Sequence, residues 1–189
     1  SMNNSNILIT ALLLTIAGIV VSSCDRSKIE QELKQLTGTE ITVPHDSLLA
    51  FNYKDKVQLD SSEYKYVIYY DSTVCSTCTL KNMYYWEVLR DSVSSLGANV
   101  NFVFIFAPRK EERGKFLSDL KNAREEFIAF VDTSGCFIKR NCQIPQNVNA
   151  HAFLLDSDNK VIMVGNAQNN PAIETLFWKI IHRTNENEK

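Results

Sequence analysis

Two cysteines three residues apart, Cys75 and Cys78, constrain this chain more than any other feature. They stand where an apolar run over 66–70 gives way to a segment whose apolar residues recur every three or four positions. The first pattern is typical of a β-strand and the second of an amphipathic helix. A Cys-x-x-Cys at such a strand-to-helix junction indicates a redox-active pair.

The spacing suits disulfide chemistry because residues three apart share one face of a helical turn, where their sulfurs can bond. We expect Cys75 to be the exposed nucleophile. The helix dipole and the unpaired N–H groups of the first turn should lower its pKa below that of a free thiol. Cys78, one turn further in, is expected to be more buried and to resolve the mixed disulfide on Cys75.

Two other interpretations of the pair stay open. A Cys-x-x-Cys can supply half of a zinc site, but there is no second such pair, and the three histidines, His45, His151 and His182, are scattered. The pair can also form a static disulfide. The sequence therefore predicts no metal and no other cofactor.

Composition narrows the choice of partners. The 189 residues, 44% of them hydrophobic, can bury one sizeable core, so we expect a single domain after processing. The net charge of −2, without a basic stripe, argues against nucleic acid and against an anionic membrane surface as partners.

The N-terminus has the features of a secretion signal. Residues 7–21 form an uncharged run, short for a membrane span and of the length of a signal-peptide core. It ends in Val-Ser-Ser-Cys, which resembles the lipobox of bacterial lipoproteins. The resemblance implies that residues 1–23 are a lipoprotein signal peptide and that Cys24 carries a lipid anchor. Residues 2–6 lack Lys and Arg, so a buried N-terminal helix is an open alternative.

An anchored protein of this kind would lie in the cell envelope, facing the periplasm or exposed at the surface, where disulfides persist. Residues 24–39 would form the anchor cysteine and a tether helix, because apolar residues recur there at helical spacing before Gly38. Residues 40–189 would form the folded domain. Its expected partners are the lipid bilayer, through acylated Cys24, protein thiols or disulfides of the envelope, and a redox partner protein.

Beyond residue 40 the pattern alternates strands and helices. Strands are expected over 66–70, 100–106, 127–131, 152–156 and 161–164, with helices over 77–96, 109–123 and from 171 onward. Apolar stretches at 41–43 and 57–59 predict a short N-terminal β extension, and the charged run 109–113 is interpreted as a solvated face. The order predicts an α/β fold of parallel units followed by an antiparallel hairpin and a helix.

With the cysteine pair at the start of the helix after the first core strand, this order resembles the thioredoxin fold, and in particular the extracytoplasmic TlpA-like thiol-disulfide oxidoreductases. The likeness covers about residues 40–183. Residues 149–156 look like the segment that often reads x-Pro-Thr-x-Phe-Leu-x-Asp in that family. The resemblance implies a central mixed β-sheet flanked by helices, and disulfide exchange through Cys75 and Cys78.

The chain departs from the family around the cysteines. Val74 stands where a tryptophan is common, and Ser76 and Thr77 fill the gap in which the family has a proline. Tyr69 stands where thioredoxin keeps a buried acid, which leaves Asp71 as the nearest carboxylate. The family's reduction potential therefore cannot be transferred to this chain.

The family's cis-proline, which faces the disulfide, aligns with Ala150, followed here by His151. A cis bond before a residue other than proline costs about 2.5–4 kcal/mol, so a trans Asn149–Ala150 bond with a reshaped substrate groove is an open alternative. His151 is a candidate modulator whose imidazole could stabilise the Cys75 thiolate or relay its proton. Otherwise it faces solvent, hydrogen-bonds backbone, or joins both cysteines at a metal site.

A further two cysteines, Cys136 and Cys142, stand six residues apart. On a continuous helix their side chains would point about 120° away from each other, so a mutual disulfide needs an irregular segment. Buried single side chains, a second disulfide, and a second redox pair that passes electrons to Cys75 and Cys78 are the open interpretations.

The sequence thus predicts a membrane-anchored, extracytoplasmic thiol-disulfide oxidoreductase. One alternative is a non-catalytic envelope lipoprotein of the same fold, with a static disulfide and a groove that binds a partner. Another is a peroxiredoxin-like peroxidase, whose Pro-x-x-x-Thr-x-x-Cys motif, placed on Cys75, finds Ile68 at the proline and Ser72 at the threonine.

Overall fold

The computed structural model describes residues 31–53, 56–123, 127–146 and 151–187. The chain divides after Gln35 into two units, and the second carries the fold described below. The expected signal peptide and Cys24 lie outside the described residues. Among the helices that are described, none is both long and apolar enough to span a bilayer.

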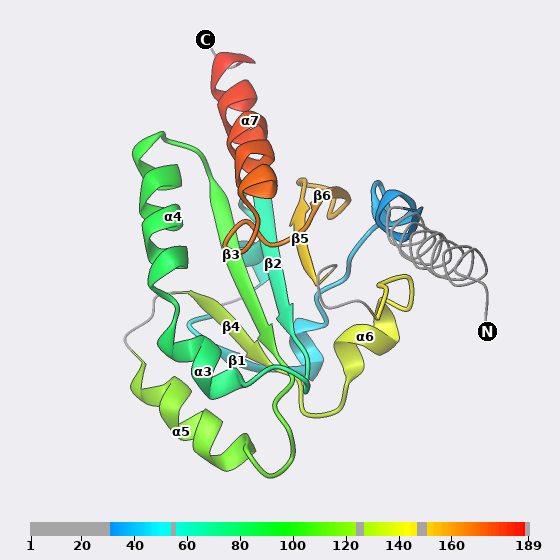
Figure 1. Cartoon of the computed structure of the whole chain (residues 1–189), viewed down its shortest axis with the longest axis vertical. Coiled ribbons are helices and arrows are strands. Elements are labelled where there is room, and N and C mark those ends of the chain that lie inside the picture. Colours follow the sequence, from blue (N-terminus) through cyan, green and yellow to red (C-terminus); the bar gives the residue numbers. More distant parts are fainter. Residues whose placement is uncertain (1–30, 54–55, 124–126, 147–150, 188–189) are drawn as a thin grey trace, which may run out of the picture. The chain divides into compact units, whose positions relative to one another are not determined.

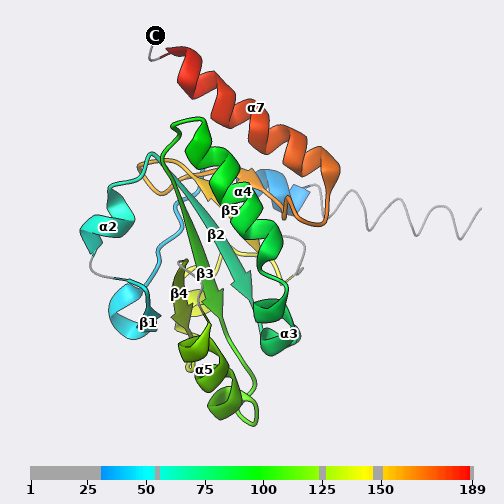
Figure 2. The ribbon, with the colours of Figure 1, turned by 90° about the vertical axis from the view of Figure 1, so that its left-hand side faces the viewer.

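A six-stranded mixed β-sheet forms the centre of the second unit (Figure 1). In spatial order its strands are β1 (Leu49–Phe51), β4 (Ile128–Val131), β3 (Val100–Phe106), β2 (Tyr64–Tyr70), β5 (Ala152–Leu155) and β6 (Val161–Val164). Strands β2, β3 and β4 run parallel, whereas β1 and the β5–β6 hairpin pair antiparallel. The carboxyl ends of the three parallel strands therefore meet at one end of the sheet; Figure 2 shows β2 and β3 pointing the same way.

Helices cover both faces of the sheet. One face packs against α3 (Ser76–Lys81), α4 (Tyr84–Ser95), α5 (Arg113–Asn122) and α7 (Pro171–Asn187), and the other against α2 (Lys56–Asp60) and α6 (Cys136–Arg140). Along β2, Tyr66 and Ile68 face the first set, and Val67 and Tyr69 face the second. Covering on both faces explains why the central strand β3 is almost continuously apolar, as the sequence predicts.

The predicted order of strands and helices beyond residue 64 is confirmed, but the expected single helix over 77–96 is wrong. It is divided into α3 and α4 at Asn82 and Met83. The side-chain amide of Asn82 donates to the carbonyl of Cys78 at 2.9 Å, and its backbone N–H donates to Thr79. These bonds satisfy carbonyl groups at the C-terminal end of α3, which therefore ends after six residues. Helix α4 begins at Tyr84.

The predicted N-terminal extension has different elements. Residues 57–59 lie in helix α2, and residues 41–43 form no strand; the one strand described in this region is β1. A short apolar run indicates that its residues are buried, but it is too short to show whether they form a strand or a helix. Ile41 and Leu59 both pack on the second face of the sheet.

Candidate active site

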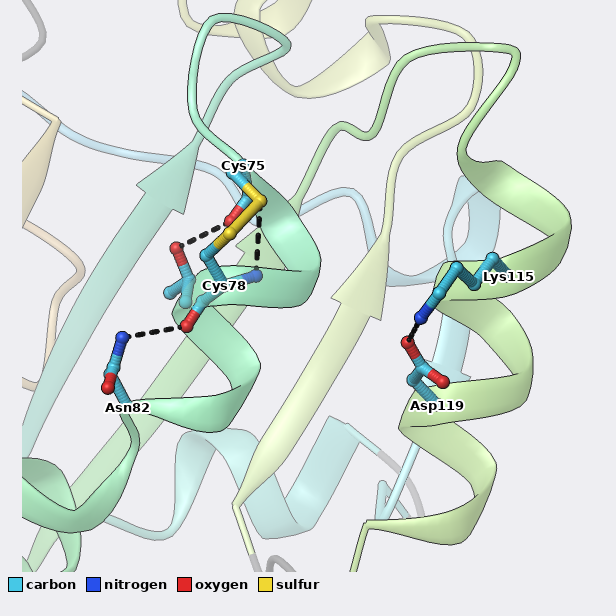
Figure 3. Close-up of a disulfide and its surroundings, with 6 residues drawn as sticks. Cys75, Cys78, Asn82, Lys115 and Asp119 are labelled. Carbon is cyan, nitrogen blue, oxygen red and sulfur yellow. Dashed lines mark hydrogen bonds and ion pairs between the residues drawn. A yellow bond between two sulfur atoms is a disulfide. The ribbon is translucent and has the colours of Figure 1, made fainter.

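Cys75 and Cys78 form a disulfide at the start of α3, with their Cα atoms 5.2 Å apart (Figure 3). Both cysteines are exposed, so the expected burial of Cys78 is wrong. Helical periodicity gives the reason. Ser76 and Leu80, four residues apart, face inward, and the two cysteines share the outward face.

The first turn of α3 directs donors at the cysteines. The sulfur of Cys75 caps the helix by accepting the N–H of Cys78 at 3.3 Å. The carbonyl of Cys75 accepts from the N–H and the hydroxyl of Thr79 at 3.0 and 3.2 Å. Once the disulfide is reduced, an N–H aimed at the Cys75 sulfur favours its thiolate form.

His151 is buried, only 6% exposed, and is bound to groups other than the disulfide. Its Nε2 lies 2.9 Å from the carbonyl oxygen of Pro145; because a carbonyl only accepts, Nε2 carries a proton. Its Nδ1 lies 3.7 Å from Oδ2 of Asp71, in the loop that leads to Cys75. The alternative of a backbone-bonded histidine is confirmed. Residues 147–150, with the Asn149–Ala150 bond, lie outside the described part of the chain.

Tyr69 packs its ring against His151 and Phe137, with ring centroids 5.3 and 5.0 Å away. Burial, assisted by the charges of Asp132 and Asp71, raises the pKa of Tyr69 to about 12. The phenol therefore stays neutral at physiological pH, and Tyr69 does not replace the buried acid of thioredoxin as a titrating group.

Cys136 and Cys142 are both free thiols. Cys136 is the first residue of α6 and is half-buried, whereas Cys142 is exposed just beyond the helix. Because both thiols are free, the alternative of a second disulfide between them is not formed in this structure. The interpretation of buried single side chains is wrong for Cys142. Within the described ranges, no group of three or more His, Cys, Asp or Glu side chains is placed to hold a metal ion.

The loop after β4 repeats the pattern of the loop after β2. In each, an aspartate follows the strand directly and a cysteine comes four residues later at a helix start: Asp71 and Cys75, and Asp132 and Cys136. The carboxylate of Asp132 accepts the N–H groups of Cys136 and Phe137 at 3.1 and 2.9 Å. Burial alone would raise the pKa of Asp132, but backbone hydrogen bonds outweigh it and lower the pKa. This correspondence is not among the sequence predictions, although the two Asp-x-x-x-Cys spacings are readable in the sequence.

A cleft of about 520 Å³ opens among the loops that follow β2, β3 and β4. It is lined by Asp71 and Ser72 from the first loop, by residues 107–111 and Arg113 from the second, and by residues 132–135 from the third. Carboxyl ends of parallel strands are where ligands commonly bind in open α/β sheets. The cleft shares with the disulfide the loop between β2 and α3.

No protein-family model and no curated protein matches the chain, but solved structures resemble it. A Chlorobium tepidum protein proposed to be the thiol:disulfide interchange protein DsbE matches with a TM-score of 0.51 and 15% identity, over 77% of this chain and 97% of that chain. A thioredoxin-like protein in its oxidized form matches at 0.49 and 16%, over 80% and 96%. A domain of a Cytophaga hutchinsonii protein, suggested to be a thiol-disulfide isomerase, matches at 0.46 and 16%, over 79% and 97%.

The chain has a thioredoxin-like fold. The Chlorobium tepidum match and the mixed six-stranded sheet flanked by helices confirm the α/β fold expected from the sequence. Because one fold serves many activities, the function of this thioredoxin-like protein has to be argued from its own side chains.

Proposed function

We propose that this protein is a thiol-disulfide oxidoreductase in which Cys75 attacks and Cys78 resolves. The observation that carries the proposal is an exposed disulfide at the first helical turn after a central strand of a thioredoxin-like sheet. A disulfide stabilises a fold mainly by closing a long loop, and this one spans a sequence separation of 3. A purely structural role would therefore contribute little stability.

The exchange proceeds in two displacements. When the protein acts as a reductant, the Cys75 thiolate attacks one sulfur of a substrate disulfide, forms a mixed disulfide and releases the other substrate sulfur as a thiolate. The Cys78 thiolate then attacks the Cys75 sulfur, which restores the protein disulfide and releases the second substrate thiolate. Two electrons pass to the substrate, and the released thiolates take up protons. A redox partner protein must reduce the pair again.

The same steps in reverse oxidise a substrate dithiol. The N–H of Cys78 donates to the sulfur of Cys75. It stabilises the Cys75 thiolate both when this thiolate attacks a substrate and when it leaves the mixed disulfide. The peroxidase alternative loses support, since Ile68, at the proline position of that motif, is buried within β2. The proposed substrates are protein thiols or disulfides.

A trapping experiment tests these roles. The C78S variant, reduced and mixed with a protein disulfide such as insulin, should accumulate a mixed disulfide on Cys75 that mass spectrometry detects. The double variant C75S/C78S should trap nothing. A C78S protein that forms no mixed disulfide, or one that forms it through Cys142, would overturn the assignment.

We further infer that the protein works in the cell envelope, held to a membrane through lipid on Cys24. The support comes from the sequence, in the uncharged run 7–21 and the lipobox-like residues that follow it, and from the exposed disulfide, which persists best in an oxidising compartment. Labelling of the full-length chain with an alkyne fatty acid in a bacterial host should mark the wild type and not C24S. Equal labelling of both would contradict the anchor.

A further inference from the structure

Two arginines in the cleft beside the Cys75 loop are held in place by the backbone. Arg109, Lys110 and Arg113 line the cleft. Arg109, Lys110 and Glu111 are exposed, as expected of a solvated face, and two side chains of the run 109–113 also bind the backbone of other loops. The Nε–H of Arg109 donates to the carbonyl of Ser72 at 2.8 Å, and Nη2 of Arg113 donates to the carbonyl of Thr133 at 2.7 Å. The arginines thereby join the three loops at the carboxyl end of the sheet.

Two of the three acids in the cleft are already engaged by the protein. Asp132, only 2% exposed, accepts backbone N–H groups at the start of α6. Asp71 accepts the N–H of Thr73 at 2.8 Å and faces His151. Glu111 is exposed, as are Arg109 and Lys110, so solvent screens all three charges. Three basic and three acidic side chains thus line the cleft, and what distinguishes it is the set of guanidinium N–H groups that Arg109 does not use within the protein.

The way Arg109 is held leaves its ligand-binding end available. A guanidinium has five N–H groups, and Arg109 uses the one on Nε for Ser72. Its Nη groups can form paired hydrogen bonds with a carboxylate. Because the side chain is already fixed, binding costs less conformational entropy than it would for a free surface arginine.

We propose that this cleft binds an acidic segment of the polypeptide whose cysteine exchanges with Cys75, so that the protein selects substrates with Asp or Glu near the reacting sulfur. The inference rests on the proposed oxidoreductase function. Ser72 stands three residues before Cys75, at most about 11 Å along extended chain. The N–H of Val74 donates to the carbonyl of Asp71, a turn that brings the two closer. An extended peptide covers that distance in about three residues, which sets the spacing between its acids and its cysteine.

Three disulfide probes test the proposal. Two are peptides of equal length with one internal disulfide, and carry three Glu or three Lys residues starting about three positions from the first cysteine. The third is hydroxyethyl disulfide, which is uncharged and reports on the exchange chemistry. Pre-reduced protein is followed through a single turnover, so no external reductant is needed. We expect the Glu peptide to react roughly tenfold faster than the Lys peptide at low salt, with a smaller ratio at high salt.

Variants that lack positive charges in the cleft test which residues cause the preference for the Glu peptide. R109Q should lower the Glu-to-Lys rate ratio roughly two- to fivefold, and R109Q/R113Q should lower it further. The matched control K121Q/R183Q also removes two positive charges, from exposed positions on α5 and α7 outside the cleft, and should leave the ratio unchanged. Equal rates for both peptides, or an equal loss in the control, would overturn the proposal.

Failure of the proposed function can be recognised separately. A protein that reduces none of the three probes would contradict the oxidoreductase assignment. Binding of a fluorescent Glu-rich peptide without cysteine would then still test the cleft, since R109Q should weaken this binding and K121Q/R183Q should not. Absence of such binding would overturn the inference about the cleft.

Discussion

In the loops after β2 and β4, the same chain pattern places a cysteine in two different environments. After β4, the carboxylate of Asp132 accepts the first N–H groups of α6, including that of Cys136 itself. After β2, the carboxylate of Asp71 accepts the N–H of Thr73, which precedes the helix. The sulfur of Cys75 accepts the N–H of Cys78 within the helix. The donors of the helix terminus go to a carboxylate in one loop and to a sulfur in the other.

The two cysteines therefore have different surroundings. Burial, together with the nearby charge of Asp132, raises the pKa of Cys136. Cys75 is exposed and has an N–H donor at its sulfur and a second cysteine three residues on, where Cys136 has Lys139. On the proposed function, a helix start after a parallel strand is not sufficient to make a cysteine reactive, and the acceptor that takes the helix donors decides the difference.

The largest expected difference between the loops is in activity. C75S should lower the rate of disulfide exchange at least about a thousandfold, because the attacking thiolate is lost. C136S should leave the rate within about twofold of the wild type. Insulin reduction measures both. A C136S protein as inactive as C75S would show that the second loop takes part.

The second expected difference is in stability. D132A removes a buried acceptor of backbone N–H groups and should lower the free energy of unfolding by about 2–4 kcal/mol. D71A, whose carboxylate binds an exposed turn, should cost less than about 1 kcal/mol. Urea denaturation near neutral pH measures both. Equal losses would mean that the two carboxylates have the same structural role.

The pH dependence of that loss follows from the lowered pKa of Asp132. A folded-state pKa below the ordinary 3.8 stabilises the fold above that value, and the contribution disappears as the pH falls through the lowered pKa. The difference in stability between wild type and D132A should therefore be constant from about pH 5 to 8 and shrink below about pH 4. A difference that grows on acidification would contradict the assignment.

A smaller effect is expected in thiol reactivity. In the reduced protein at pH 7, iodoacetamide should modify Cys75 at least about tenfold faster than Cys136, because the thiolate is the reacting form. D132A should raise the rate at Cys136 by removing a negative charge and freeing its N–H. Peptide mass spectrometry gives both rates. Equal rates at Cys75 and Cys136 would remove the contrast between the loops.

The smallest effect is expected when the second loop is given a cysteine pair of its own. K139C gives the second loop a Cys-x-x-Cys of its own, and it should not restore exchange in the C75S background. Spacing alone would be recreated, while Asp132 would still hold the helix donors. Insulin reduction above the C75S level would show that spacing alone is sufficient.

Much of the fold could be predicted because its signals are local. The apolar runs of β2 and β3 and the helical spacing in α4 and α7 identify their own elements. The break at Asn82 was missed because it depends on one side-chain hydrogen bond to Cys78. The short elements β1 and α2 were missed because their runs are too brief to show a period.

The site could be predicted only where its residues are adjacent in sequence. Cys75 and Cys78 form such a pair. The contact of Arg109 with Ser72 depends on the parallel pairing of β2 with β3, and that of His151 with Asp71 depends on the antiparallel pairing of β2 with β5. No pattern around Arg109 could indicate that its side chain reaches the loop before the cysteines.

A redox titration of the Cys75–Cys78 pair against glutathione tests the central claim most directly. An exchanging pair should equilibrate with the buffer at a reduction potential between about −120 and −270 mV, the range of thiol-disulfide oxidoreductases. A potential below about −300 mV, which is typical of structural disulfides, would contradict catalysis and favour a static bond in a partner-binding protein.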